Sequence, residues 1–319
     1  MTAVVDGRDP AEIAAAAGLL REGQVVGFPT ETVYGLGADA FNSEAVGRIF
    51  AAKDRPADNP LIVHVADVAG ARAVVAEFPP LAVKAAARWP GALTLVLPRG
   101  PRVPDIVTAG GATVGVRVPA HPVALALLRE FGGPVAAPSA NRSGRPSPTL
   151  ARHVLADLDG RIPLILDGGA TDVGLESTVV DLTRAVPLVL RRGGVTLETL
   201  RAALGPVDCL SGQDTEAVAR SPGLRHRHYA PRARVVIVAE GEGEAALRGA
   251  GRAGLIARRV VDGEFVRVLP ASPEGFARGL FAALRELDEL GLERIVVEGI
   301  DEAGLGAAIM DRLRRAAEG

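Results

Sequence analysis

The chain has 319 residues, of which 48% are hydrophobic and 23% charged, and its formal net charge at pH 7 is −2. This length and composition are typical of a soluble globular protein with room for two domains. The near-neutral charge excludes a globally basic surface, so nucleic-acid binding would need a local patch. We expect a cytoplasmic protein with no membrane partner, because no apolar run approaches the roughly 18 to 20 residues of a membrane span and no signal peptide is apparent.

Several common kinds of site are excluded by what the sequence lacks. Cys209 is the single cysteine, which excludes an internal disulfide framework and a cluster of cysteine metal ligands. The five histidines are not at the i, i+4 spacing of a helical zinc pair, and neither a P-loop nor a Gly-x-Ser-x-Gly motif occurs. P-loop transfer, serine hydrolysis and zinc-protease chemistry are therefore not expected.

The first third of the chain predicts strands whose ends carry polar residues. Residues 9–23 predict a helix, and the apolar run 25–28 predicts a buried strand that stops at Pro29. Residues 30–32, Thr-Glu-Thr, then lie at a strand end, where side chains can face a ligand.

A second predicted helix delivers Lys53 and Arg55 just before Pro56 ends it. Two cations at a helix end usually form a solvated terminus that complements the helix dipole. Only two of the 36 basic residues are lysines, however, and one of them is retained here. The next predicted strand, over residues 61–65, carries His64 near its end.

The middle of the chain adds two further strand ends. The alternation in residues 113–119 predicts a strand with Thr113 and Arg117 on one face, so both can point into one cleft. A buried strand over residues 135–137 runs into a loop over residues 138–149 that is rich in Ser, Pro, Gly and Asn and could hold phosphates.

The last part of the chain predicts a second, smaller domain. We expect a first domain over residues 1–204, an interdomain linker over 205–233, which holds three prolines, and a second domain over 234–319. Strands and helices alternate after residue 234, which predicts a small parallel sheet. A glycine pattern at residues 241–246 has the shape of a dinucleotide fingerprint, but the glutamates around it would repel a pyrophosphate.

These predictions together describe a cleft of lysine, arginines, hydroxyls and amides. Such a lining suits adenylyl or phosphoryl transfer, in which the protein positions the reactants and stabilises charge. No acidic cluster marks a metal site made by the protein itself.

Three sequence blocks carry a more specific resemblance. The first is Pro29-Thr30-Glu31-Thr32-Val33-Tyr34-Gly35-Leu36-Gly37 followed by Lys53-x-Arg55-Pro56, the second is Pro138-Ser139-Ala140-Asn141, and the third runs from Ser221-Pro222-Gly223 to His228-Tyr229-Ala230-Pro231. In this order they resemble the long, two-domain form of the YrdC-type threonylcarbamoyl-AMP synthases. The resemblance implies an α/β protein with a YrdC-like twisted mixed sheet, followed by a smaller Rossmann-like parallel α/β domain, with the linker folded over the active site.

The resemblance also implies a reaction. L-threonine, bicarbonate and ATP would give threonylcarbamoyl-AMP and pyrophosphate, which is the first step in making N6-threonylcarbamoyladenosine in tRNA. The chain would then be a nucleotidyltransferase that uses Mg²⁺ with ATP, and a downstream tRNA threonylcarbamoyl transferase machinery would take its product.

The same resemblance assigns roles to individual residues. The implied catalytic residues are Lys53, Arg55, Ser139 and Asn141. The implied threonine-binding residues are Thr32, His64, Arg117, Ser139 and Ser177. The implied ATP-binding residues are Arg55, Asn59, Thr113, Asn141, Thr149, Arg191 and Tyr229. The sequence departs from the family pattern at Arg192, where a proline is usual, and at Arg225 and His226, where lysine and tyrosine are usual.

Two alternatives remain open at this point. A double-stranded RNA binding module without catalysis would account for Arg142, Arg145 and Arg192, because arginine-rich loops bind phosphates. It would not account for Thr32, His64 and Ser177, which are uncharged groups suited to a small polar ligand. The second alternative is a related enzyme that adenylates a different carbamoyl donor.

Overall fold

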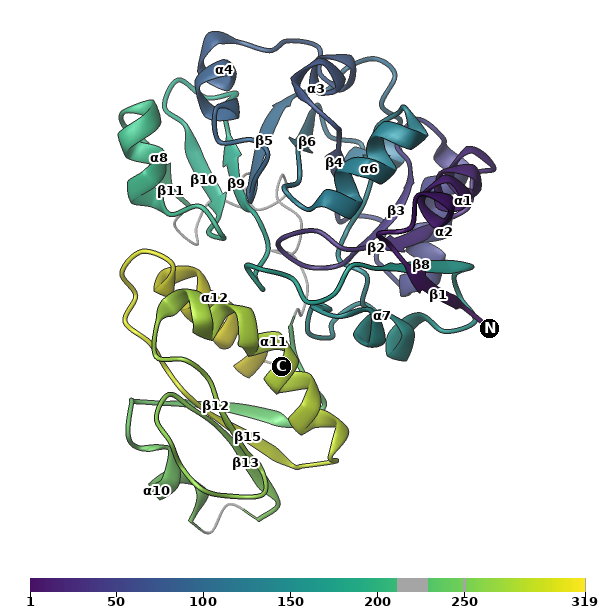
Figure 1. Cartoon of the computed structure of the whole chain (residues 1–319). Helices are drawn as coiled ribbons and strands as arrows, with labels where there is room; N and C mark the ends of the chain where they lie inside the picture. Colours follow the sequence, from purple (N-terminus) through teal and green to yellow (C-terminus); the bar gives the residue numbers. More distant parts are fainter. Residues whose placement is uncertain (211–228, 249–250, 319) are drawn as a thin grey trace.

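The structure is a computed structural model that describes residues 1–210, 229–248 and 251–318. Two sheets organise these residues, one of eleven strands and one of four (Figure 1). We call the larger sheet with its helices the N-terminal unit and the smaller one the C-terminal unit. The part of the predicted linker that includes Arg225 and His226 lies outside the described residues. No helix in the described ranges is long and apolar enough to cross a membrane.

The large sheet is mixed, as the family resemblance implied. Its strands in spatial order are β1 (Ala3–Asp6), β8 (Leu164–Asp167), β2 (Val26–Phe28), β3 (Gly35–Asp39), β7 (Val135–Ala136), β4 (Ile62–His64), β6 (Thr113–Arg117), β5 (Leu93–Pro98), β9 (Thr178–Asp181), β10 (Leu188–Arg191) and β11 (Asp208–Cys209). β4 and β6 are parallel, and β7 is antiparallel to β4. The register pairs His64 with Arg117, so two predicted site residues become neighbours at one strand end. β11 lies within the stretch that we expected to be linker.

The helices of the N-terminal unit connect its strands. They are α1 (Pro10–Arg21), α2 (Ser43–Lys53), α3 (Val68–Val74), α4 (Pro80–Ala86), α5 (Asp105–Thr108), α6 (Pro122–Phe131), α7 (Ala151–Leu158) and α8 (Leu197–Leu204). Asp9 caps α1 by accepting a hydrogen bond from the amide of Ala11. Asp54 is left-handed, with φ of 52°, so α2 ends at Lys53 and the chain turns before Arg55.

The C-terminal unit is the small parallel sheet that the sequence predicted. Its strands in spatial order are β12 (Arg234–Val238), β15 (Arg294–Glu298), β13 (Ala253–Ala257) and β14 (Val266–Val268), and all of its pairings are parallel. Its helices are α10 (Gly243–Leu247), α11 (Pro273–Glu289) and α12 (Gly306–Ala317). Figure 1 shows α11 and α12 on the face of this sheet that is turned toward the N-terminal unit.

The glycine pattern after β12 binds a carboxylate of the protein itself. The backbone amides of Gly241 and Gly243 donate to Oε1 of Glu298, at 3.0 and 3.3 Å, and the amide of Arg258 donates to Oε2 at 3.0 Å. Glu298 is fully buried. The amides that a dinucleotide fingerprint would offer to a phosphate are therefore used inside the fold.

The two units share buried contacts. Val33 and Leu175 of the N-terminal unit belong to the same apolar cluster as Phe276 and Phe281 of α11. Arg285 of α11 donates to the carbonyl of Pro146 and, at 2.7 Å, to the carboxylate of Asp157. Both side chains of this ion pair are buried, with 4% and 0% of their surfaces exposed.

This interface generates a stability prediction. Arg285→Met should lower the free energy of unfolding by about 1.5 to 3 kcal/mol, because the buried carboxylate of Asp157 loses one charged partner and keeps only its ion pair with Arg145. Arg152→Met is the matched control, since Arg152 pairs with Glu286 across the same interface while 66% of its side chain is exposed. The control should lose less than about 1 kcal/mol. Thermal unfolding followed by circular dichroism measures both, and equal melting temperatures for the two variants would show that the buried pair does not hold the interface.

Candidate active site

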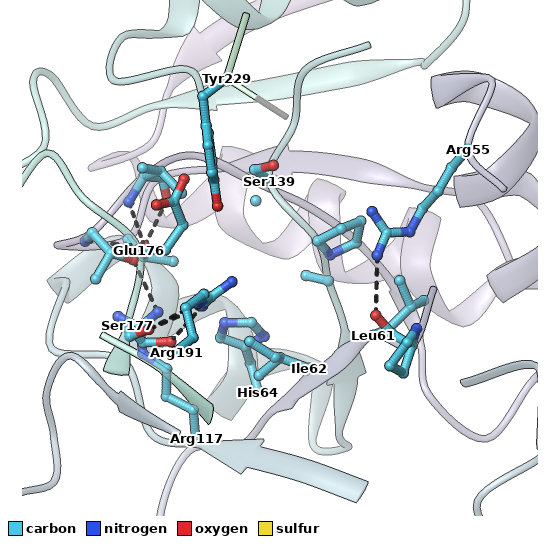
Figure 2. Close-up of a pocket in the computed structure, with 17 residues that line it drawn as sticks. Arg55, Leu61, Ile62, His64, Arg117, Ser139, Glu176, Ser177, Arg191 and Tyr229 are labelled. Carbon is cyan, nitrogen blue, oxygen red and sulfur yellow. Dashed lines mark hydrogen bonds between the residues drawn. The ribbon is translucent and has the colours of Figure 1, made fainter. Parts of the chain in front are cut away.

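One cavity gathers polar residues from several strand ends and loops (Figure 2). The β2–β3 loop contributes Thr30, Thr32 and Val33, and the segment through β4 contributes residues 60–62 and His64. The cavity lies where β4, β6, β9 and β10 end or begin, which is why residues far apart in sequence meet there.

Eight of the predicted site residues line this cavity. They are Thr32, Arg55, His64, Arg117, Ser139, Ser177, Arg191 and Tyr229. Five others do not line it: Lys53, Asn59, Thr113, Asn141 and Thr149. Some of the predicted site residues therefore lie on the surface of one cavity, and the others do not reach it.

Arg117, the last residue of β6, is held on three sides. Its Nη1 donates to the hydroxyl of Thr32 at 2.9 Å, and its Nε donates to the carbonyl of Gly91 at 3.1 Å. Its Nη2 lies 2.6 Å from Oε1 of Glu31 in a buried ion pair. This contact does not have the geometry of a hydrogen bond, and neither carboxylate oxygen of Glu31 accepts one from another group among the described residues. The guanidinium is thus fixed beside the cavity by a carboxylate that the sequence reasoning did not include in the site.

Arg191 and Ser177 are joined at the neighbouring strand ends. Nη2 of Arg191 donates to the carbonyl of Ser177 at 3.0 Å and to its hydroxyl at 3.3 Å (Figure 2). The Ser177 hydroxyl also shares a hydrogen bond of 2.8 Å with the hydroxyl of Thr94. Burial lowers the pKa of Arg191 below its ordinary value. A second arginine is therefore oriented by backbone and hydroxyl groups.

His64 presents a neutral ring to the cavity. It is 5% exposed, and its ring packs edge-on against Phe28 with centroids 6.1 Å apart. Burial, followed by the charge of Arg117, lowers the pKa of His64 to about 3. Its Nδ1 has no hydrogen-bond partner within the described part of the chain. A neutral imidazole with an unused nitrogen is suited to hydrogen bonding with a polar ligand.

Arg55 lines the cavity on the side opposite Arg191 in Figure 2. Its Nη2 donates to the carbonyls of Asn59 and Pro60, at 3.2 and 3.0 Å. Its Nε has no partner among the residues that the structure describes. Burial lowers the pKa of Arg55 to about 10, so the side chain stays positive at neutral pH. Arg55 can thus offer both charge and a donor to an anion.

Lys53 lies behind the cavity wall and not on its surface. It is 1% exposed, and its ammonium group donates to the backbone carbonyls of Ser139 and Asn141. Burial, followed by the charge of Arg55, lowers the pKa of Lys53 well below its ordinary value. We expected a cation that contacts the substrate, whereas in this geometry the contacts of Lys53 are to the loop that presents Ser139.

Asn141 supports the same loop from within. Its side-chain amide donates to the carbonyls of Arg142 and Arg145, at 2.8 and 2.9 Å. The hydroxyl of Ser139 donates to its side-chain oxygen at 2.5 Å. Asn141 is 2% exposed. Ser139 is therefore the member of the Ser-x-Asn pair that reaches the cavity.

The remaining three predicted residues lie away from the cavity surface. Asn59 is buried, and its carbonyl receives the hydrogen bond from Arg55. Thr113 is at the start of β6, four residues or roughly 13 Å along the strand from Arg117. A shared face therefore does not bring Thr113 into this cavity. Thr149 is buried next to His153, whose Nδ1 accepts from the Thr149 amide at 3.3 Å.

Glu176 and Arg312 are two further residues that the sequence did not mark as part of the site. Glu176 lines the cavity beside Ser177, and its Oε2 accepts from Nε of Arg312 at 2.8 Å. Arg312 belongs to α12 of the C-terminal unit and is 1% exposed. Glu176 could have been found from its position just before the start of a strand. Arg312 gave none, because a charged residue on a helix is usually solvated.

The arrangement favours chemistry on a polyanion. Within the described residues, three arginines and one glutamate line the cavity, alongside hydroxyls and a neutral histidine. No group of three or more His, Cys, Asp or Glu side chains that could hold a metal occurs in the described ranges. Preorganised positive charge and uncharged donors can bind phosphates and a small polar substrate together.

Comparisons with known proteins agree over the whole chain. Residues 18–193 match the Sua5/YciO/YrdC family model, which is described as telomere recombination, and residues 195–318 match the C-terminal domain of threonylcarbamoyl-AMP synthase. The threonylcarbamoyl-AMP synthase of Pyrococcus abyssi is 46% identical, with 99% of this chain and 98% of that protein covered. The one of Bacillus subtilis is 47% identical, with 98% and 94% covered.

A solved structure shows the same likeness. The crystal structure of Pyrococcus abyssi Sua5 complexed with L-threonine superposes with a TM-score of 0.93 at 44% identity, and the match covers 100% of this chain and 98% of that one. Together with the sequence matches, this likeness establishes that the chain belongs to the Sua5/YrdC family of threonylcarbamoyl-AMP synthases, in the form that carries the additional C-terminal domain.

Proposed function

We propose that the cavity makes L-threonylcarbamoyladenylate from L-threonine, bicarbonate and ATP and releases pyrophosphate. The observation that carries this proposal is the meeting of Arg55, Arg117 and Arg191 with uncharged hydrogen-bonding groups around one cavity, in a chain of this family. The enzyme is a nucleotidyltransferase that acts in tRNA modification. We place it in the cytoplasm, where ATP and tRNA are available.

The threonine end of the cavity is proposed to lie around Arg117. A guanidinium can bind the substrate carboxylate through two parallel hydrogen bonds. Thr32, His64 and Ser177 supply uncharged groups for the substrate hydroxyl. Glu31 would hold Arg117 in place and offset part of its charge, since the two form an ion pair of 2.6 Å.

Two bond-forming steps follow from this placement. In the first, the uncharged amine of threonine forms an N–C bond with carbon dioxide derived from bicarbonate, and the amine loses a proton to give a carbamate. In the second, a carbamate oxygen attacks the α-phosphorus of ATP, the bond to the bridging oxygen breaks, and pyrophosphate leaves. Both reactants of the second step are anions, so positive charge must stand between them. Arg55 and Arg191 are proposed to supply it, and the Ser139 hydroxyl would donate to the substrate in place of its present acceptor, Asn141.

The nucleotide is proposed to arrive as the magnesium complex of ATP. Its phosphate oxygens and water would complete the coordination of Mg²⁺, which usually keeps several waters in such sites. Tyr229 lines the cavity and offers a ring beside it. Asn59, Thr113, Asn141 and Thr149 would act through the loops and strands they support. A downstream transferase machinery would pass the threonylcarbamoyl group to tRNA.

A purely RNA-binding role is not supported, because the relatives that match along the whole chain are synthases. The sequence left two possibilities open, an enzyme and an RNA-binding module, and these relatives support the enzyme. The other alternative is an enzyme that adenylates a different carbamoyl donor. Such an enzyme would release pyrophosphate without threonine, whereas the proposed reaction requires threonine.

The first functional prediction concerns the choice of amino acid. Valine should be a poorer substrate than threonine by about four orders of magnitude, because a buried group that bonds the hydroxyl, above all Nδ1 of His64, would be left unpaired. Serine keeps the hydroxyl and should lose only roughly 1 to 3 kcal/mol. Pyrophosphate release with bicarbonate and each amino acid measures this. Release that is independent of threonine would contradict the proposed function, and valine outperforming serine would contradict the hydroxyl-reading pocket.

The second functional prediction concerns pH. Because the pKa of His64 is about 3 in the folded protein, the ring stays neutral during turnover between pH 6 and 8. The ratio of kcat/KM for threonine between the wild type and His64→Gln should therefore be constant over that range. This ratio cancels the pH dependence of the bicarbonate and of the substrate amine. A change in the ratio centred near pH 6.5 would show that His64 titrates in the working enzyme.

The same shift has a consequence for stability. A histidine in the unfolded chain has a pKa of about 6.5. As the pH falls, this histidine therefore binds a proton in the unfolded chain at a higher pH than in the folded protein. Stability is then fully present above pH 6.5 and is lost as the pH falls from 6.5 toward 3. His64→Gln should lose less stability than the wild type over this window, as melting temperatures at pH 5 and pH 7 would show.

A further inference from the structure

Arg312 joins the C-terminal unit to the wall of the cavity at three points. Its Nε donates to Oε2 of Glu176 at 2.8 Å, and its Nη2 donates to the backbone carbonyl of Arg192 at 2.8 Å. Its guanidinium carbon lies 5.2 Å from the centroid of the Tyr229 ring. The side chain is 1% exposed, so all three contacts are made away from solvent.

Two of these three partners line the cavity themselves. Glu176 and Tyr229 are both lining residues (Figure 2). Glu176 is gripped from its other side as well, because its Oε1 accepts from the Ser147 hydroxyl at 2.6 Å. Burial alone would raise the pKa of Glu176, but the charges of Arg312 and Arg191 outweigh it and lower the pKa. Arg312 thus fixes both the place and the charge of one wall residue.

The ring of Tyr229 is held between the two units. One face stacks on Phe281 of α11, with centroids 5.5 Å apart and planes at 20°, and the Arg312 guanidinium approaches the same ring. The next residue is tied to the loop after Asn141, because the amide of Ala230 donates to the carbonyl of Gly144 at 2.9 Å. The cation–π distance is within the range of an attractive contact.

We propose that Arg312 is a positioning residue for the adenylation site, which holds Glu176 and Tyr229 in the arrangement that accepts ATP. This inference rests on the proposed function. Its physical basis is that one rigid, planar cation makes directed contacts to two wall residues from a helix of the other unit. The cavity wall is then complete only when α12 is docked, and the C-terminal unit takes part in nucleotide binding without touching the nucleotide.

The test compares Arg312→Met and Arg312→Lys with the wild type. The readouts are kcat and KM for ATP in threonine-dependent pyrophosphate release, at a temperature where circular dichroism shows each variant folded. Arg312→Met should lower kcat/KM for ATP by about 10- to 100-fold, mainly through KM, because a displaced wall misplaces the substrate. Arg312→Lys keeps the charge but cannot bridge Glu176 and Arg192 as a planar fork does, so its loss should be intermediate.

If Arg312 only stabilised the fold, its variants would lower kcat and leave the KM for ATP unchanged, because KM does not depend on the fraction of molecules that are folded. Arg314→Met is the matched control on the same helix: Arg314 is 51% exposed and pairs with Glu302, and its KM for ATP should be that of the wild type. Because Arg312 acts on Tyr229 as well as on Glu176, the double variant with Tyr229→Leu should lose less than the sum of the two single losses.

Three outcomes are decisive. An unchanged KM for ATP, within twofold, in the folded Arg312 variants would overturn the inference, as would full additivity with Tyr229→Leu. If Arg312→Met does not fold, Arg312→Lys decides by the same criterion. Wild-type enzyme that releases no pyrophosphate with threonine would instead remove the proposed function, and that result is visible before any variant is compared.

Discussion

Buried positive charge around one cavity is the constraint on which the rest of this structure depends. Arg55, Arg117 and Arg191 all lie at the cavity wall with little exposure to water. Removing such ions from water costs several kcal/mol each unless carboxylates and hydrogen bonds compensate. The fold supplies Glu31 for Arg117, places Glu176 near Arg191, and directs the carbonyls of Ser177 and Pro60 at guanidinium groups. Anionic substrates would complete the compensation, which is why a charge-rich pocket suits ATP and a carbamate.

That constraint also explains why two units are needed to build one site. Glu176 is the only carboxylate among the described residues of the cavity lining, and it is shared with Arg312 from α12. The α11 and α12 helices therefore do more than cover an apolar face: they bring cations to Asp157 and Glu176 of the other unit. The glycine loop of the C-terminal unit meanwhile closes on Glu298. Each unit uses backbone amides or guanidiniums to satisfy a buried carboxylate.

The sequence predicted the parts of this picture that depend on local rules. Period-two strands, capped helices and the parallel C-terminal sheet followed from spacing. The strand-end positions of His64 and Arg117 pointed to a ligand site, the resemblance added Ser177, and all three line one cavity. Burial was harder to predict. Lys53 was expected to contact a ligand, but its ammonium group is buried and donates to two backbone carbonyls of the loop that holds Ser139. Thr113 shares β6 with Arg117, but it lies at the other end of the strand, away from the cavity. Arg312 and Glu176 are 136 positions apart, and no local pattern reports such a pairing.

The central claim, that this cavity binds a nucleotide through its buried positive charge, can be tested on the protein alone. The measurement is the melting temperature of the protein with ATP and Mg²⁺, and with adenosine at the same concentration, in the absence of threonine so that no turnover occurs. A ligand at 100 times its Kd stabilises the folded state by about 2.7 kcal/mol, which corresponds to several degrees for a chain of this size. Binding through charge predicts that shift with ATP and little or none with adenosine. Equal shifts with both ligands, or none with ATP, would contradict it.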